Sequence, residues 1–337
     1  MNGFVTLHHG SGGSKMHDLI RKIFVKHFSN QALNDLRDSA ILQNPRSGLA
    51  FTTDSYVVDP VFFPGGDIGK LAVCGTLNDL AVSFAKPVAL SASFILEEGL
   101  PLADLERIVR SMARETKKAG IPIVTGDTKV VPRGKCDKLF INTSGIGLVR
   151  NPAKGSGPSR PIRAGDCIVL SGPLGEHAIA ILLARESFQF RARVKSDCAS
   201  LYPMIASITA ISGRIRVMRD VTRGGLSTVL NEIIGTERTG ILLSESKIPV
   251  SREVNAVCEL LGFDPLNLAN EGRFIAVVGK EDAGTVVERV KGFPDGKHAA
   301  VIGEVVAEHP GKVMMRTVSG GYRRVEMVSG EQLPRIC

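Results

Sequence analysis

The chain ends in a cysteine, and this last residue is the first candidate for chemistry. The tail reads LPRIC, and Pro334 prevents a helix from running to the end. Residues 325–332 before it are polar without a clear period, which predicts a mobile tail that reaches beyond the packed domain. A thiol reacts as its thiolate, and the α-carboxylate of Cys337 disfavours that form, so a cation such as Arg335 would be needed nearby. The pattern alone leaves a reactive thiol and a chance free cysteine both open.

Four aspartates stand in small-residue settings that are typical of a metal–phosphate site. Asp54 follows the apparent strand LAFTT and Asp127 follows IPIVT, while GTLNDLA contains Asp79 and MRDVTRGG contains Asp220. Carboxylates at strand ends project into a cleft, and Mg²⁺ usually bridges one or two of them to substrate phosphates. Asx-turns and helix caps explain any single one equally well. Lys129 could neutralise a transferring phosphoryl group, or it could be a solvated surface lysine.

A glycine-rich segment near the N-terminus could bind the same phosphates. Residues 8–15 read HHGSGGSK, a run of small residues whose backbone N–H groups can approach phosphate oxygens ahead of a helix. Neither this segment nor GGDIGK at residues 65–70 matches the Walker A loop. A flexible loop before an ordinary helix cap is the alternative interpretation. The candidate phosphate-binding residues are Gly10, Ser11, Gly12 and Gly13.

Composition limits the class of protein. The 337 residues predict two domains at about 100–200 residues each. No apolar run of about 18 residues and no basic-then-apolar leader occurs, so we expect neither a membrane span nor a secretion signal. The six cysteines form no CxxC pair, which disfavours zinc ribbons and thioredoxin-like motifs, and the surroundings of the first five indicate reduced thiols in a cytosolic protein. The net charge of +8 is dispersed and no RNA-stacking motif occurs, which favours an anionic ligand over nucleic acid.

Apolar periodicity predicts strands and helices in both halves of the chain. Residues 151–163, with three prolines and two glycines, form the predicted linker between domains 1–150 and 164–324, and residues 325–337 form the tail. Helices are expected at residues 15–29, 69–85, 102–119, 175–185, 226–234 and 281–291. Strands are expected at residues 49–53, 56–58, 88–96, 121–125, 139–149, 167–171, 274–278 and 300–306.

Taken together, these segments resemble one family over nearly the whole chain. The matching pieces are HGSGG at 9–13, FTTDSYVVDPVFFPGGDIGKLAVCGTLNDLA at 51–81, GIPIVTGDTKVV at 120–131, MRDVTRGGL at 218–226, NEGR at 270–273 and PRIC at 334–337. The chain resembles the HypE family of carbamoyl dehydratases, which help to mature nickel–iron hydrogenases. That family lies within the PurM-like, AIR synthase-related superfamily, whose other members share its fold and ATP site but lack the PRIC tail.

The resemblance implies an α/β (α+β) fold of two PurM-like domains, with the N-terminal domains of a homodimer forming a β-barrel at their interface. It implies ATP and Mg²⁺ in the cleft, and no membrane or nucleic-acid partner. The implied Mg²⁺–phosphate ligands are Asp54, Asp79, Asp127 and Asp220. The other implied ATP-binding residues are Gly10, Ser11, Gly12, Gly13, Lys129 and Asn231. The implied catalytic residues are Cys337, Lys129 and Glu271.

The implied reaction takes place on Cys337. HypF would carbamoylate the thiol, and the tail would then enter the cleft. ATP would phosphorylate the carbamoyl oxygen, and phosphate would leave while a base removes the nitrogen protons, so that a thiocyanate remains. The cyano group would pass to iron on a HypC–HypD complex.

Two alternatives belong to other classes. The first is a carrier that only presents Cys337, against which the cluster of aspartates argues. The second is another PurM-like ATP-dependent synthetase or kinase acting on a small amide or phosphate, against which the PRIC tail argues.

Overall fold

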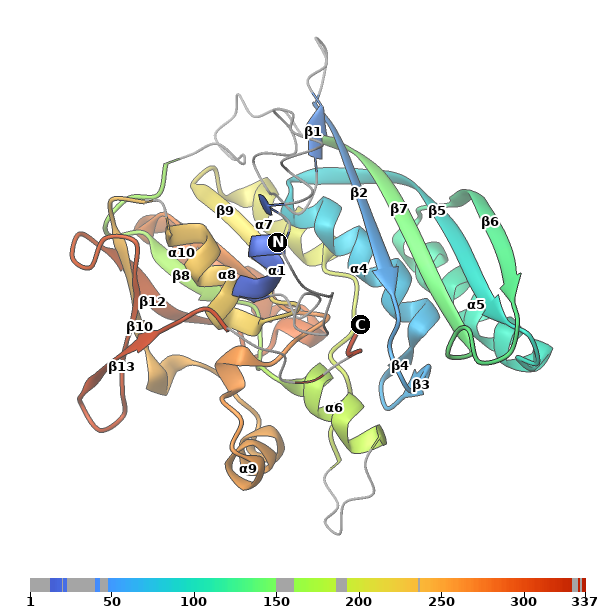
Figure 1. Cartoon of the computed structure of the whole chain (residues 1–337). Coiled ribbons are helices and arrows are strands. Elements are labelled where there is room, and N and C mark those ends of the chain that lie inside the picture. The colour runs from blue at the N-terminus through green and yellow to red at the C-terminus, as the bar shows by residue number, and fades with distance from the viewer. Residues whose placement is uncertain are drawn as a thin grey trace.

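Two large mixed sheets with helices packed on them make up most of the described chain, and a small two-stranded sheet is the third (Figure 1). The computed structural model describes residues 13–19, 21–22, 40–42, 48–149, 161–185, 193–235, 237–328, 333 and 335–337. Both sheets contain antiparallel and parallel pairs, which agrees with the α/β (α+β) prediction. Most of the predicted linker and the second half of the predicted helix at 15–29 lie outside the described residues.

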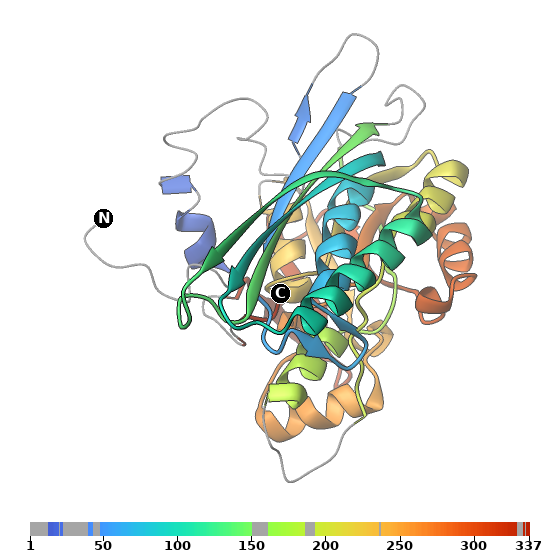
Figure 2. The same cartoon turned by 90° about the vertical axis from the view of Figure 1, so that its right-hand side faces the viewer.

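The N-terminal sheet has five strands in the order β1-β2-β7-β5-β6. Only β5 and β6 run parallel. Two helices, α4 and α5, lie against one face of it, and within the described residues no helix covers the other face (Figures 1 and 2). The elements are α1 (Ser14–Leu19), β1 (Ala40–Leu42), β2 (Gly48–Tyr56), β3 (Phe62–Phe63), β4 (Gly66–Asp67), α4 (Ile68–Val82), β5 (Ala85–Glu97), α5 (Leu102–Ala119), β6 (Ile123–Val131) and β7 (Leu139–Val149).

The C-terminal sheet has seven strands in the order β14-β13-β10-β12-β8-β11-β9. Alternation along β8 places Ile168 and Leu170 in the core beneath α8, while Val169 faces α7 and α10. The elements are β8 (Cys167–Leu170), α6 (Glu176–Arg185), α7 (Tyr202–Ile211), β9 (Ile215–Asp220), α8 (Gly225–Ile234), β10 (Gly240–Ser244), η4 (Glu245–Lys247), α9 (Arg252–Leu261), η5 (Pro265–Asn267), β11 (Phe274–Val278), α10 (Lys280–Lys291), η6 (Pro294–Gly296), β12 (Ala300–Val306), β13 (Val313–Arg316) and β14 (Tyr322–Val325).

The GGDIGK segment forms a turn and a helix cap. The Asp67 carboxylate accepts hydrogen bonds from the Gly69 and Lys70 N–H groups at 2.9 and 3.0 Å, which caps α4. The next helix, α5, ends at Gly120 in the left-handed conformation, which confirms the stop predicted there. These caps fix where α4 and α5 begin and end behind the sheet.

Two strand boundaries were predicted wrongly. The two short strands expected at residues 49–58 are one continuous strand, β2, with Asp54 inside it. The strand expected to stop at residue 125 begins at Ile123 and runs on to Val131, so Asp127 also lies within a strand. The small polar residues that suggested strand ends continue the main-chain ladder with β7 and β5.

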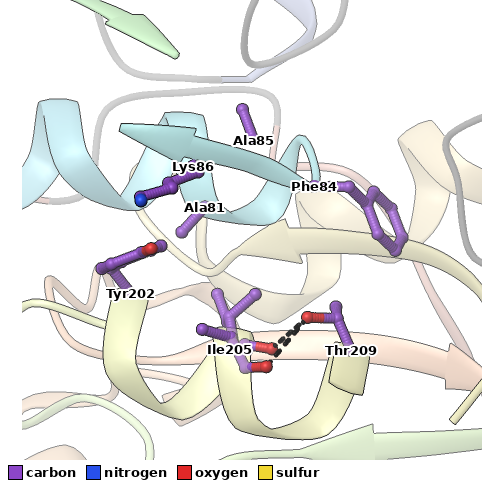
Figure 3. Close-up of a pocket in the computed structure, with 8 residues that line it drawn as sticks. Ala81, Phe84, Ala85, Lys86, Tyr202, Ile205 and Thr209 are labelled. Atoms are coloured by element: carbon purple, nitrogen blue, oxygen red, sulfur yellow. Dashed lines mark hydrogen bonds between the residues drawn. The ribbon is translucent and has the colours of Figure 1, made fainter. Parts of the chain in front are cut away.

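Side chains from both halves share one core. Residues of α4 and α5 pack with Ala178–Leu182 of α6 and with Val254 and Val257 of α9. A second contact lies between the end of α4 and α7, where Phe84 and Tyr202 border a small crevice (Figure 3). None of the predicted site residues lines this crevice.

Candidate active site

The last residues of the chain lie between the two sheets (Figures 1 and 2). The Val57 N–H donates to an oxygen of the terminal carboxylate of Cys337 at 3.0 Å, and the Asp59 N–H donates to the Arg335 carbonyl oxygen at 3.3 Å. Ile336 is only 6% exposed and belongs to the shared core. The prediction that the tail reaches beyond the packed domain is therefore wrong for its last three residues. The Ile336 side chain is buried in the core, and main-chain oxygens of the tail accept hydrogen bonds from Val57 and Asp59, which follow β2.

Helix α6 supplies two further contacts to the tail. His177 Nε2 lies 2.7 Å from the Ile336 carbonyl oxygen. The Arg185 guanidinium donates to the main-chain oxygens of Asp59 and Arg335. We refer to Val57, Asp59, His177 and Arg185 as the tail seat.

Arg335 does not serve the thiol as the sequence suggested. Its guanidinium pairs with the Asp137 carboxylate, donates to the Val57 carbonyl oxygen and lies 6.0 Å from the centre of the Phe140 ring. The cation that acts on the Cys337 thiol is Arg223, from the MRDVTRGGL segment. Arg223 was not among the predicted site residues, although its segment is one of those that carry the family resemblance.

The surroundings of the Cys337 thiol disfavour its ionised form. Burial raises the pKa of the thiol, Arg223 lowers it, the carboxyls of Glu271, Asp54 and Asp220 raise it, and the resulting pKa is about 12. We call Asp54, Asp220 and Glu271 the acidic cluster. A docked thiol is therefore neutral at physiological pH. Because a neutral thiol is a poor nucleophile, this position suits a thiol that already carries a group.

Asp54 and Asp79 meet between β2 and α4. Burial raises the pKa of Asp54, while a hydrogen bond with the Asp79 carboxyl and the charge of Arg223 lower it. Thr52 donates to Asp79 at 2.6 Å, and the Tyr56 hydroxyl donates to Asp54 at 3.2 Å. Among the described residues, no group of three or more His, Cys, Asp or Glu side chains is arranged to hold a metal ion alone. Two adjacent carboxylates still fit Mg²⁺, which takes one or two protein carboxylates together with phosphate oxygens.

Glu271 carries a carboxyl oxygen without a partner. Glu271 is 4% exposed, and its Oε1 makes no hydrogen bond with any of the described residues. Burial raises the pKa of Glu271 well above its usual range, Asp220 and Asp197 add to the rise, and Arg223 opposes it. A buried, unpaired carboxyl oxygen beside a thiol is costly unless it has a use there.

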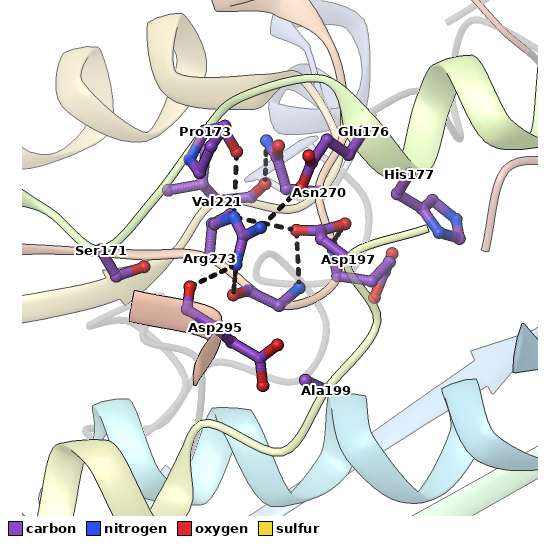
Figure 4. A network of polar contacts seen from close by, with 12 residues as sticks. Ser171, Pro173, Glu176, His177, Asp197, Ala199, Val221, Asn270, Arg273 and Asp295 are labelled. Atoms are coloured by element: carbon purple, nitrogen blue, oxygen red, sulfur yellow. Dashed lines mark hydrogen bonds and ion pairs between the residues drawn. The ribbon is translucent and has the colours of Figure 1, made fainter. Parts of the chain in front are cut away.

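The backbone around Glu271 is fixed by a polar network (Figure 4). The Asp197 carboxylate accepts from the N–H groups of Glu271 and Gly272, both at 3.1 Å. A Cβ atom at Gly272 would lie 1.9 Å from the Asp197 carbonyl oxygen, so only glycine fits. Arg273 pairs with Glu176 at 2.6 Å and lies 3.6 Å from Asp197.

A second turn holds Asp220 and Arg223 beside Glu271. The Asn270 main-chain and side-chain N–H groups both donate to the Val221 carbonyl oxygen at 3.0 Å. Gly225 has φ of 64° and begins α8 against the backbone of residues 266–268, where a Cβ atom would clash. The DVTRGG and NEGR segments, fifty residues apart in sequence, are thus one unit.

The described end of the glycine-rich segment packs against Val328, and the helix that follows it, α1, contacts α8. A Cβ atom at Gly13 would lie 2.0 Å from the Val328 carbonyl oxygen. His17 of α1 lies 2.7 Å from Glu232 of α8, and the side chain of Asn231 donates to two main-chain oxygens. The candidates that lie outside the described residues are Gly10, Ser11 and Gly12.

Asp127 and Lys129 lie away from the other site residues within one chain. The register aligns Asp54 with Gly126 across β2, β7, β5 and β6, so three strand spacings of about 4.8 Å separate them. Because neighbours along a strand face opposite sides, Asp127 points to the face opposite Asp54. There it pairs with Lys129 at 2.7 Å, with both side chains exposed, and Lys129 lowers the pKa of Asp127.

The cysteines and the helices were also the subject of predictions. All six cysteines are free, as predicted for reduced thiols. Of the helices in the described part of the chain, none is long and apolar enough to cross a membrane.

The chain matches the family models of both domains of AIR synthase related proteins. The N-terminal domain model matches residues 36–149, and the C-terminal domain model matches residues 163–316. Both matches agree with the fold predicted from the resemblance.

Relatives match the chain along its whole length. A protein of Rhodobacter capsulatus named carbamoyl dehydratase HypE is 50% identical over 335 residues, covering 99% of this chain and 98% of the relative. A solved HypE–HypF complex contains a chain that is 43% identical, with a TM-score of 0.86, covering 92% of this chain and 99% of that one. A HypE structure with ATP is 48% identical, with a TM-score of 0.82, covering 98% of this chain and 100% of that one.

Proposed function

Since the chain belongs to the HypE family of AIR synthase-related carbamoyl dehydratases, we propose that the thiol it works on is its own last residue, Cys337. The chain is an ATP-dependent carbamoyl dehydratase of hydrogenase maturation. The observation that carries the proposal is the docked tail, whose Cys337 thiol lies among Asp54, Asp220, Glu271 and Arg223. Cys337 is then a tethered substrate, and the acidic cluster and its surroundings are the catalyst.

The reaction removes the elements of water from a carbamoylated thiol. The carbamoyl oxygen takes the γ-phosphoryl group of ATP, and phosphate then leaves as the C–O bond breaks. The two nitrogen protons go to a base and to solvent, and the C≡N bond forms, so the products are thiocyanate, ADP and phosphate. We assign the role of base to Glu271, whose free Oε1 lies in the same buried cluster as Cys337.

Asp54, Asp79 and Asp220 are the proposed carboxylates for Mg²⁺ and the phosphates of ATP, with Gly10, Ser11, Gly12, Gly13 and Asn231 on the nucleotide. The cation would supply charge stabilisation at the γ-phosphate. Its positive charge would also lower the pKa values of the buried carboxyls, which brings Glu271 toward the range suited to proton transfer near neutral pH.

Replacing Asp54 by asparagine is expected to weaken Mg·ATP binding by at least about tenfold, because a charge-assisted contact contributes about 1.5–3 kcal/mol. Isothermal titration calorimetry measures this affinity. Glu259→Gln, which neutralises an exposed carboxylate on α9, is the control and should leave affinity unchanged. An Asp54→Asn chain that binds Mg·ATP as tightly as the original would remove Asp54 from the site.

In a homodimer, Asp127 and Lys129 could contribute to the active site of the partner subunit. The uncovered face of the N-terminal sheet exposes Phe51 (43%), Ile95 (44%), Ile146 (37%) and Leu148 (45%). Such an apolar sheet face favours burial against a second copy, as in the intersubunit β-barrel that the resemblance implies. We propose that each subunit lends Asp127 and Lys129 to the site of its partner, because within one chain they face away from Asp54.

Lys129→Ala is expected to slow dehydration roughly 10²-fold, as for the loss of one group that stabilises transition-state charge. Phosphate release from the carbamoylated chain measures the rate. Lys135→Ala is the control and should leave the rate unchanged, because Lys135 is an exposed lysine that follows the strand in which Lys129 lies. Unchanged turnover in Lys129→Ala would make Lys129 a surface residue.

Mixed dimers test from which subunit Lys129 acts. A hybrid of Lys129→Ala with Glu271→Gln chains contains one complete site only if Lys129 crosses the interface. Activity in the mixture, where each variant alone is slow, is the expected result. No recovery after subunit exchange would mean that Lys129 serves its own chain.

Carbamoylation of Cys337 would take place with the tail out of its seat, because the docked thiol is neutral. A relative has been solved as a HypE–HypF complex, and this complex supports HypF as the carbamoyl donor for Cys337. We further propose Mg²⁺ as the metal, a HypC–HypD complex as the acceptor of the cyano group and the cytoplasm as the compartment.

A further inference from the structure

His177 is a fully buried histidine in the first turn of α6. One ring nitrogen, Nε2, lies 2.7 Å from the Ile336 carbonyl oxygen, and the other, Nδ1, lies 2.7 Å from the Ser196 hydroxyl. The Phe63 ring meets the imidazole edge-on, with ring centres 5.5 Å apart. Both nitrogens are thus occupied, and packing holds the ring in one orientation.

The contacts of His177 determine where its proton lies. A carbonyl oxygen can only accept, so Nε2 carries the hydrogen and donates it to Ile336. Nδ1 of the neutral ring then accepts from the Ser196 hydroxyl, whose oxygen in turn accepts from the Cys198 N–H at 3.0 Å. Burial lowers the pKa of His177, which agrees with a neutral ring.

The segment at residues 196–198 links this contact to Glu271. Ser196 orients His177, and the next residue, Asp197, accepts from the N–H groups of Glu271 and Gly272 at 3.1 Å. One short segment therefore fixes both the last peptide bond before Cys337 and the backbone of the proposed base.

We propose that His177 is a positioning residue, whose Nε2–H holds the Ile336 carbonyl so that the group on Cys337 lies against Glu271 for dehydration. This inference rests on the proposed function. A substrate tethered to its own catalyst gains rate only if the tether keeps it in reacting geometry, and small misplacements lower the rate. His177 acts on the docked tail, so it should affect dehydration and leave the earlier transfer of the carbamoyl group unaffected.

Two amide variants separate the two ring nitrogens. His177→Gln places its amide near the position of Nε2 and can still donate to Ile336, whereas His177→Asn places its amide near Nδ1 and loses that donor. Each full-length chain is carbamoylated with HypF and carbamoyl phosphate, isolated, and then given Mg·ATP. Intact mass follows two events separately, the gain of the carbamoyl group and its loss of one water.

The expected result is a difference between the two steps and between the two variants. Carbamoylation and ATP affinity should stay at the wild-type level in both. Dehydration should stay within about threefold of wild type in His177→Gln and fall at least about fivefold in His177→Asn, since an unmade buried hydrogen bond costs about 1–3 kcal/mol, or roughly five- to 150-fold. A second variant without the donor, His177→Ala, keeps the comparison available if the asparagine chain does not fold.

Three outcomes would overturn the proposal. They are wild-type dehydration in a folded chain that lacks the donor, loss of dehydration in folded His177→Gln, and an equal fall of carbamoylation and dehydration in either variant. The wild-type chain separates this inference from the proposed function. If wild type itself forms no thiocyanate, the function fails; if wild type forms it and the variants behave alike, only the role of His177 fails.

Discussion

Replacing Glu271 by glutamine is expected to stop the reaction at the carbamoylated thiol. Glutamine fills the same buried space but cannot take a proton, and loss of a general base costs on the order of 10²- to 10⁴-fold in rate. The variant should accept the carbamoyl group, bind ATP and accumulate the carbamoyl adduct at Cys337. Intact mass after addition of Mg·ATP measures the amount of adduct that remains.

The same substitution should stabilise the fold at neutral pH. The pKa of Glu271 is raised in the folded protein, so between the unfolded and folded values the native state binds more protons, and the stability contributed by this group is lost as pH rises. Glutamine does not titrate, so the stability of the Glu271→Gln chain does not fall with pH in this way. Melting curves should show that the stability of Glu271→Gln relative to wild type grows from pH 5 to 8, a range that lies above the usual glutamate pKa of about 4.3.

Either of two results would contradict the role given to Glu271. One is turnover to thiocyanate at the wild-type rate. The other is a variant that is less stable than wild type at pH 8, since that would mean the carboxyl is ionised and well paired in the resting protein. Glu259→Gln serves again as the matched control, because it makes the same chemical change at an exposed position.

Replacing Cys337 by alanine is expected to abolish thiocyanate formation completely while leaving ATP affinity nearly unchanged. The alanine chain lacks the atom that carries the group, so no residual rate should remain. The tail should still dock, because Val57, His177 and Arg185 bind main-chain oxygens and Ile336 keeps its place in the core. Intact mass measures the adduct, and calorimetry measures ATP affinity.

The other five cysteines provide the control for this prediction. Cys167→Ala is the matched change, because Cys167 is the other cysteine residue that is only partly buried and lies on β8. It should form thiocyanate as the wild type does. If Cys337→Ala still gained a carbamoyl or cyano group, the substrate thiol would be elsewhere and the account of the tail would be wrong.

Periodicity predicted some of the helices and strands, but α7, α9, β9 and β10 were not predicted. The helix at 102–119 and the strands at 139–149, 274–278 and 300–306 agree residue for residue with α5, β7, β11 and β12. In α5 and β7 a regular apolar pattern matches one buried face, whereas β11 is a continuous apolar run that is buried on both faces. The strands β13 and β14 lie at the edge of the C-terminal sheet and have no such unbroken pattern, and they were not predicted.

The site depends on contacts that no local pattern encodes. The Cys337 thiol meets Arg223 and Glu271 because the chain end packs onto residues 57–59, more than 270 positions earlier. The tail looked mobile because the residues before it are polar without a clear period and Pro334 prevents a helix. It is held by one buried isoleucine, by the main-chain carbonyls of Arg335 and Ile336 and by the terminal carboxylate of Cys337. The separation of Asp127 from Asp54 likewise follows from strand register, which could not be determined from one strand sequence.

The central claim is that Cys337 is a tethered substrate of the cleft in which it docks. The most direct test is to isolate the chain carbamoylated on the thiol, add Mg·ATP and map the product by mass spectrometry of the C-terminal peptide. The account predicts that the adduct on Cys337 becomes lighter by one water as a thiocyanate, with one phosphate released for each. A carbamoyl group that stays unchanged, or a dehydration that proceeds equally without ATP, would contradict it.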